Sequence, residues 1–229
     1  NRVLIKRTKG GIGDVLNHRM MFQDLRAALP GAHISCAVPR EFWSMLWHHP
    51  FIDEALPLDK CNESDYAMTY DTTDRCGRYE FATLPRVDKH RSDIWAEGMG
   101  LKLTHHEGFV GFDRDESKRA AALMDPGAGG GKPMVLCATR TAGRHKDWPA
   151  ERWQEVISEL SRDYRIFSTD KTRTDFTDCN NLPQMDLRTW LACVAQADYV
   201  LTLATSTFVA ANLLHKPTVA IFGVEDLGI

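Results

Sequence analysis

The sequence has no long uninterrupted apolar segment. Every apolar run is far shorter than the roughly 18 residues that a helix needs to cross a bilayer. The first residues, Asn1 to Arg7, are too short and too polar for a signal peptide, and we interpret them as the first strand of a fold. These absences predict a cytoplasmic protein. They leave peripheral contact with the inner face of the membrane open.

Charge of one sign is not in excess. The chain of 229 residues carries 28 Lys and Arg against 31 Asp and Glu, a formal net charge of −3. Such a balance provides no general attraction for a polyanion, so we expect no nucleic-acid partner. The length is sufficient for two small α/β units, each with its own core.

Motifs for metal binding and for several kinds of catalysis are also missing. The six cysteines form no C-x-x-C pair and the histidines complete no zinc-ligand spacing, so we predict no metal site. Cys36, Cys137 and Cys193 lie in apolar runs, which is typical of buried free thiols in a reducing compartment. No G-x-S-x-G serine elbow and no G-K-[ST] phosphate loop occur.

What the chain does contain is an alternation of strand-like and helix-like segments, which predicts an α/β fold with parallel sheets and crossover helices. A stretch rich in glycine and proline, residues 125–133, interrupts this alternation and indicates a linker. We therefore predict a lobe of residues 1–125 and a second lobe of residues 133–229. The expected strands are 3–7, 33–38, 52–58, 66–70, 134–138, 165–168, 199–203 and 218–222. The expected helices are 15–29, 41–47, 92–100, 117–124, 150–160, 187–196 and 206–214. We predict irregular structure for residues 71–92, which are mostly polar.

The first candidate site is the loop of residues 8–16, which follows a strand and opens a helix. Gly11 and Gly13 let the backbone pass close to a ligand, and the helix start offers unpaired N–H groups. The third glycine of a dinucleotide fingerprint is missing, because Leu16 occupies its place. A second interpretation stays open, in which this is a tight turn with Asp14 as the helix N-cap.

The second candidate site is the loop of residues 138–148, again between a strand and a helix. It carries the hydroxyls of Thr139 and Thr141 and the cations Arg140, Arg144 and Lys146. Such a loop at the carboxyl end of a parallel strand suits phosphates. A solvated basic loop is an equally good interpretation.

The third candidate site is the strand-to-helix junction at Thr205, Ser206 and Thr207. Three adjacent hydroxyls can contact a phosphate or cap the helix, and capping needs only one of them.

Together these loops resemble the heptosyltransferase family, glycosyltransferase family nine. Four segments carry the resemblance and occur in the family's order: Val3–Leu16, Lys146–Trp153 with its K-x-W-P run, Leu182–Leu187 and Lys216–Gly223. The resemblance implies the GT-B fold, in which the parallel sheets of two Rossmann-type lobes face a central cleft. The first lobe would bind the acceptor and the second the nucleotide sugar.

The resemblance also implies a reaction. A heptose or related sugar would pass from a nucleotide-diphosphate sugar, most simply an ADP-sugar, to a glycan or lipopolysaccharide-type acceptor. Transfer would proceed with inversion, with no metal and no cofactor besides the donor. Asp14 would be the general base, Thr141 and Lys146 would contact the donor diphosphate, and Met185 would face the nucleotide base. The oligomeric state stays open.

The chain departs from the family pattern at Ala204–Val209. The family's Asp-Ser/Thr-Gly run and the histidine after it are absent there. This departure keeps an alternative open: a catalytically degenerate relative that serves as a nucleotide- or glycan-binding or assembly module. A nicotinamide-dependent oxidoreductase is disfavoured because the third glycine is missing.

Overall fold

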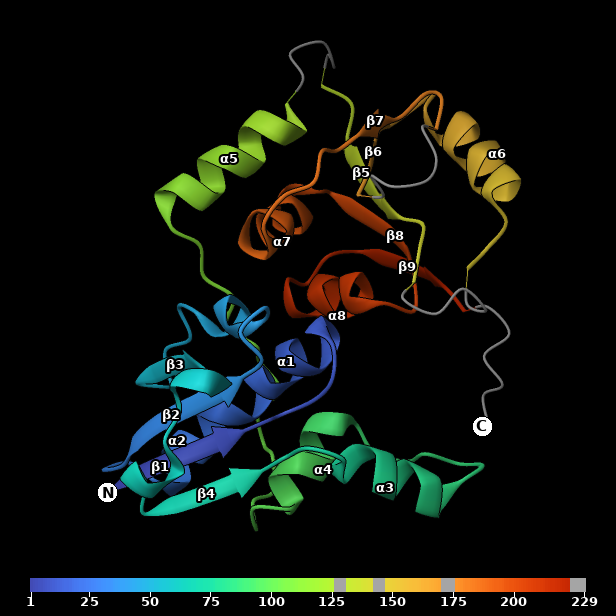
Figure 1. Cartoon of the computed structure of the whole chain (residues 1–229). Helices are drawn as coiled ribbons and strands as arrows, with labels where there is room; N and C mark the ends of the chain where they lie inside the picture. Colours follow the sequence, from blue (N-terminus) through green and yellow to red (C-terminus); the bar gives the residue numbers. More distant parts are fainter. Residues whose placement is uncertain (126–130, 142–146, 170–175, 223–229) are drawn as a thin grey trace. The chain divides into compact units, whose positions relative to one another are not determined.

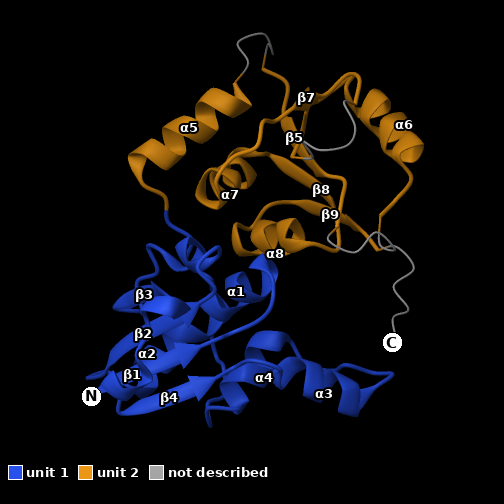
Figure 2. Cartoon of the chain, viewed as in Figure 1, with its two compact units in different colours: residues 1–111, 226–229 blue, residues 112–225 orange. Residues whose placement is uncertain are grey.

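The computed structural model describes residues 1–125, 131–141, 147–169 and 176–222. These residues form two compact units, one of Asn1–Gly111 and one that begins at Phe112 (Figure 2). Each unit has its own parallel sheet with helices packed around it (Figure 1), so the predicted α/β class with two Rossmann-type lobes is confirmed. Within the described ranges, no helix combines the length and the hydropathy needed to cross a membrane.

The first unit is built on a four-stranded parallel sheet in the order β3-β2-β1-β4. The chain adds β2 and β3 on one side of β1 and then crosses to the other side for β4. The carboxyl ends of β1 and β4 therefore flank a switch point, where open α/β sheets bind ligands. The strands are β1 (Arg2–Lys6), β2 (His33–Val38), β3 (Glu54–Pro57) and β4 (Met68–Asp71), and the helices are α1 (Ile12–His18), α2 (Phe22–Ala28), α3 (Arg75–Thr83) and α4 (Arg91–Glu97).

The second unit repeats this plan with five parallel strands in the order β7-β6-β5-β8-β9. Its switch point lies between β5 and β8, whose register places Ala138 beside Thr202. The strands are β5 (Met134–Ala138), β6 (Arg165–Ser168), β7 (Asn180–Asn181), β8 (Tyr199–Leu203) and β9 (Thr218–Ile221), and the helices are α5 (Arg114–Met124), α6 (Ala150–Leu160), α7 (Leu187–Gln196) and α8 (Ser206–Leu213).

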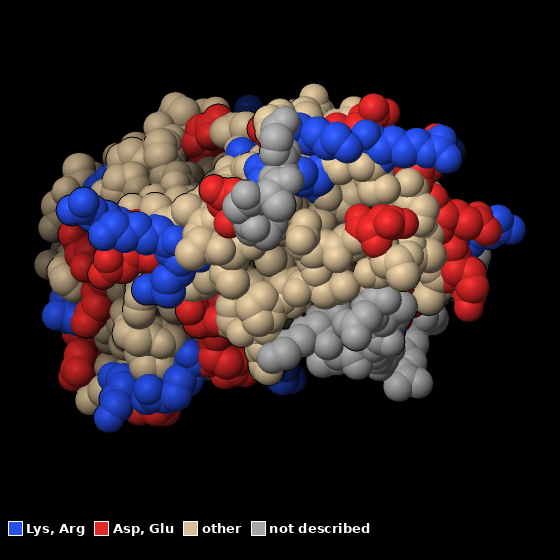
Figure 3. All heavy atoms as spheres, turned by 90° about the horizontal axis from the view of Figure 1, so that it is seen from above, with Lys and Arg blue, Asp and Glu red and all other residues tan. Residues whose placement is uncertain are grey.

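On the face shown in Figure 3, positive and negative side chains are interspersed.

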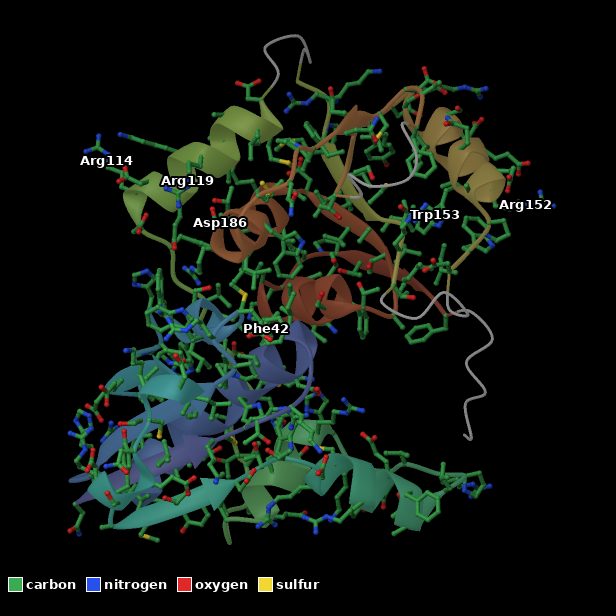
Figure 4. All side chains as sticks on the ribbon, in the orientation of Figure 1. Phe42, Arg114, Arg119, Arg152, Trp153 and Asp186 are labelled. Carbon is green, nitrogen blue, oxygen red and sulfur yellow. The ribbon has the colours of Figure 1, made fainter. Side chains whose placement is uncertain are left out.

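Helix α5 belongs to the second unit, so the units divide at Gly111, ahead of the glycine-rich stretch at 125–133. The reason is a bidentate pair in which Arg188 of α7 donates from Nε and Nη2 to the two carboxylate oxygens of Glu116, each at 2.8 Å. Both side chains are buried. One turn further along α5, Arg119 donates to Thr189 of α7 at 3.1 Å (Figure 4).

The helix expected over residues 15–29 is interrupted by a 3₁₀ turn, Arg19–Met21, between α1 and α2. Arg19 is fully buried, and its guanidinium donates to the carbonyls of Gly108, Met45, Trp47 and Phe109. The interruption of the helix thus begins at the residue whose guanidinium binds these buried carbonyls. Residues 41–47, also expected as a helix, form only a 3₁₀ turn at Trp43–Leu46.

The expectation of irregular structure over residues 71–92 is wrong, since α3 occupies its centre. The stabilising contact joins two helices: Arg91, which begins α4, donates from Nε and Nη2 to both oxygens of Glu80 on α3, at 2.7 and 3.0 Å. The predicted thiols are confirmed, because Cys36, Cys137 and Cys193 are free and buried.

Candidate functional site

The loop after β1 brings Asp14 close to the backbone of Gly10. Gly10 has φ +113°, and a Cβ placed there would lie 2.5 Å from Asp14 Oδ2 and 2.6 Å from Arg7 Nε. Only glycine accommodates both the backbone conformation and this approach. Gly11 is the N-cap of α1, Gly13 lies in its first turn, and Asp14 occupies the third helical position. The interpretation of Asp14 as the N-cap is therefore wrong.

The Asp14 carboxylate is held by two arginines. Arg7 donates from Nη2 to Oδ2 at 3.0 Å, and Arg91 donates from Nη1 to Oδ1 at 2.7 Å. The Asp14 side chain retains 12% of its exposure. Arg91 binds Glu80 as well, so one guanidinium joins two carboxylates. Burial opposes the charge of Arg91, but the hydrogen bonds and negative charges of Glu80 and Asp14 outweigh it and raise its pKa.

A buried aromatic layer supports this clamp. The ring of His18 is stacked on Trp95, with centroids 3.9 Å apart, and the Arg7 guanidinium lies 5.1 Å from the Trp95 ring centroid. His18 Nδ1 donates to the Asp14 carbonyl at 2.7 Å, and Nε2 lies 2.8 Å from the Thr72 hydroxyl. Burial lowers the pKa of His18 to about 4, so the ring is neutral at pH 7. The layer therefore fixes α1 and its carboxylate without adding charge.

A hollow of about 690 Å³ opens at the same switch point. Its lining comes from β4, from the segments after β1 and β4 and from the start of α3, and includes the hydroxyls of Thr8 and Thr73 and the cations Lys9, Arg75 and Arg78. The carboxylates Asp71 and Asp74 lie in the same wall, and Asp74 is 3.8 Å from Lys9. Hydroxyls with charges of both signs suit a polar, hydroxyl-rich ligand.

The sequence alone missed Arg7, Glu80 and Arg91. Arg7 was assigned only to the end of a strand, and the other two lie in the stretch of residues 71–92 that was taken as irregular. Asp14 and Arg91 are 77 residues apart, so no local spacing could have paired them. The one available signal was the concentration of arginines in residues 75–91.

In the second unit, two of the predicted loops meet at the switch point. Thr139–Thr141 follows β5 and Thr205–Thr207 follows β8, and these strands are neighbours. Thr139 is buried and Arg140 partly buried. Thr141 donates from its backbone N–H and its hydroxyl to Asp147 Oδ1, at 2.8 and 3.0 Å. Arg144 and Lys146 lie outside the described residues.

The junction at the start of α8 caps its own helix. Thr205 is the N-cap, and its hydroxyl accepts a hydrogen bond from the Thr207 N–H at 3.1 Å. Ser206 begins the helix and Thr207 is buried. Capping, one of the two interpretations of these hydroxyls, is therefore present.

Met185 lies apart from these two loops in the sheet order. It follows β7, which is separated from β5 by β6. The Met185 side chain is partly buried, and its sulfur lies 3.9 Å from the Cys193 thiol on α7. Thr139–Thr141 and Thr205–Thr207 thus follow two neighbouring strands, whereas Met185 precedes α7 at another place in the sheet order.

Comparisons with known proteins agree with this architecture. The sequence model described as Glycosyltransferase family 9 (heptosyltransferase) matches residues 80–228. A search of curated protein sequences gave no significant match. Solved structures give the fold: Escherichia coli heptosyltransferase WaaC with ADP-2-deoxy-2-fluoro heptose is 18% identical, with a TM-score of 0.67, and the match covers 99% of this chain and 90% of WaaC.

Two further structures have similar coverage. The glycosyl transferase family 9 protein from Veillonella parvula is 16% identical with a TM-score of 0.77, over 98% of this chain and 82% of that one. ADP-heptose lps heptosyltransferase II from E. coli is 15% identical with a TM-score of 0.71, over 97% and 85%.

Proposed function

The chain belongs to glycosyltransferase family 9, and on this premise we propose that it transfers a heptose or related sugar from a nucleotide-diphosphate sugar, with inversion, to a glycan or lipopolysaccharide-type acceptor. An ADP-sugar is the proposed donor, with no metal and no further cofactor. The six free cysteines support a reducing, cytoplasmic setting for this reaction.

The observation that carries the proposal is the clamped but accessible carboxylate of Asp14 at the switch point of the first unit. Each carboxylate oxygen has two acceptor sites, so an oxygen that already accepts from an arginine can still accept a proton from a hydroxyl. Asp14 would take the proton of an acceptor hydroxyl as the oxygen attacks the anomeric carbon. The hollow lined by Thr8, Lys9, Arg75 and Arg78 is where we place the acceptor.

The donor would bind in the second unit, at the loops that follow β5 and β8. As the bond to the anomeric carbon breaks, its electron pair leaves with the nucleoside diphosphate, whose growing charge needs donors and cations. The residues that follow the two neighbouring strands supply hydroxyls and a cation, which supports this proposal: Thr139, Arg140, Thr141, Thr205, Ser206 and Thr207. We assign Arg144 and Lys146 to the same diphosphate, and Met185 to the face of the nucleotide base.

A second candidate function is a nucleotide- or glycan-binding module without transferase activity. The observation that favours it is the start of α8, where Thr205 already caps the helix from within the chain. In this case the donor loops would bind a nucleotide, but no transfer would follow.

One experiment separates the two candidates. The protein is incubated with a panel of nucleotide sugars, with and without glycan acceptors, and nucleotide diphosphate release and thermal stabilisation are measured. We expect stabilisation by one donor, and release that depends on an acceptor. Asp14→Ala should abolish release but keep donor binding, whereas Lys146→Ala should weaken donor binding.

The outcomes are distinct. Binding without release under all conditions would establish the binding module. Stabilisation by no nucleotide would refute the donor site, and full transfer by the Asp14→Ala variant would refute the general base.

A further inference from the structure

The end of α3 exposes apolar side chains close together in the chain. Phe81 is 81% exposed, Leu84 49% and Val87 38%. We call these three residues, with the exposed cations Arg78 and Arg86, the α3 tip. In Figure 1, α3 runs away from the end of β4, the edge strand of its sheet. Single exposed apolar residues are ordinary, but three within seven positions at the end of a helix form a patch.

The α3 tip is a structured segment. The Arg86 N–H donates to the Thr83 carbonyl at 3.0 Å and closes a turn directly after the helix. The segment then packs back on α3, because the Tyr79 hydroxyl donates to Asp88 at 2.6 Å and Lys89 Nζ lies 5.3 Å from the Tyr79 ring centroid. The exposed side chains are therefore carried on a folded support.

The charge around the α3 tip is positive in effect. Among the neighbouring carboxylates, Glu80 and Glu97 form ion pairs with Arg91 and Lys89. Asp88 keeps its negative charge, because its partner, the Tyr79 hydroxyl, is neutral, but the two arginines of the α3 tip outnumber this one anion. By contrast, Arg78 and Arg86 form no ion pair with any residue in the described part of the chain. Exposed apolar side chains flanked by these two arginines are complementary in polarity and charge to a surface that has an apolar interior and anionic groups at its boundary with water.

We propose that the α3 tip docks on an anionic lipid bilayer, with Phe81, Leu84 and Val87 entering the interface and Arg78 and Arg86 contacting lipid phosphates. Apolar burial and attraction to anionic headgroups together give surface binding without a membrane span. A second copy of the chain fits less well, because a two-fold contact pairs a patch with itself and would bring the arginines of both copies together. This inference concerns the first unit alone and does not depend on the proposed reaction.

The test is flotation of the full chain with vesicles, without donor or acceptor. One set contains phosphatidylglycerol and phosphatidylethanolamine, and the other only phosphatidylcholine. We expect binding to the anionic set at low salt and much weaker binding to the neutral set. Arg78→Gln with Arg86→Gln should weaken binding about twenty-fivefold, from about fivefold for each cation. Phe81→Ser with Leu84→Ser should weaken it at least about tenfold.

Matched controls come from the second unit. Val219→Ser removes an exposed apolar side chain, since Val219 is 64% exposed, and Arg114→Gln removes an exposed cation on α5 (Figure 4). Both should bind like the parent chain, and circular dichroism should show all variants folded. Absence of binding to anionic vesicles, or equal losses in the controls, would overturn the proposal. So would a concentration-dependent dimer that Phe81→Ser with Leu84→Ser abolishes, because the partner would then be a second copy.

Discussion

Asp14 should stabilise the first unit as well as serve the reaction, because it is a counter-ion of Arg7. The two side chains retain only 9% and 12% of their exposure and lie 3.0 Å apart, so solvent screens them little. Removing one partner of a buried pair costs about 3–5 kcal/mol. Arg7 would keep its bond to the Thr72 carbonyl and its contact with Trp95, which places the loss for Asp14→Ala at the lower end, about 3 kcal/mol.

A double-mutant cycle isolates this contribution. When Arg7→Met is combined with Asp14→Ala, no uncompensated guanidinium remains, and the double variant should regain part of the lost stability. We expect a coupling free energy of about 2 kcal/mol. The assay is urea unfolding followed by far-ultraviolet circular dichroism and tryptophan fluorescence, fitted with two transitions if the units unfold separately.

The reasoning is refuted if Asp14→Ala unfolds within about 0.5 kcal/mol of the parent chain, or if the two substitutions are additive. The cycle also decides how a loss of transfer in Asp14→Ala is interpreted. A variant that remains folded at the assay temperature and binds donor, yet transfers nothing, has lost its base and not its structure.

Three further predictions concern the Asp14 site and the buried ion pair of the second unit. Gly10→Ala should destabilise the chain by at least about 1–3 kcal/mol and impair transfer. Gly11→Ala should lower the stability far less, because the space around its Cβ position is open. Equal melting temperatures for the two variants would contradict this. His18 has a pKa of about 4 in the folded chain against an ordinary value of 6.5, so the unfolded chain binds more protons between these pH values. The stability that His18 provides above pH 6.5 should therefore be lost as pH falls toward 4, by on the order of 3 kcal/mol. In the His18→Gln variant, the plot of unfolding free energy against pH should be flatter over this range. Arg188→Met should destabilise the second unit by about 3 kcal/mol, because the buried Glu116 would lose the cation Arg188. If thermal unfolding shows a loss of stability below about 1 kcal/mol, the pair contributes little.

The sheets could be predicted from the sequence because their strands are short apolar runs bounded by turn residues. Val3, Leu4 and Ile5 form such a run, and the residues of β5 form another, as parallel strands buried on both faces require. Glycines and hydroxyls directly after those runs also indicated where the loops at the switch points lie. Strand position and loop chemistry are local properties, so the sequence reports them.

What the sequence did not reveal depends on partners far along the chain. Nothing near Arg19 indicates that it would be buried beneath carbonyls from residues 45–47 and 108–109. Helix α3 was missed because its stabilising contact, Glu80 with Arg91, crosses to the next helix. Helix α5 was assigned to the wrong side of the division because its partner, Arg188, lies 72 residues from Glu116.

The sharing of Arg91 between two anions has a mechanical consequence. Glu80 on α3 and Asp14 on α1 hold opposite sides of one guanidinium, so the helix that carries the exposed tip and the helix that carries the carboxylate are linked through a single side chain. A movement of α3 that draws Glu80 away from Arg91 would leave Asp14 as the only carboxylate of the two still bound to this guanidinium. The hydrogen bonds of Arg91 to both carboxylates therefore oppose a change in the distance between α3 and α1. Thermodynamic reciprocity sets the terms of any coupling through this link: if a ligand at the α3 tip changes the affinity for a ligand at Asp14 by some factor, the ligand at Asp14 changes the affinity at the α3 tip by that same factor.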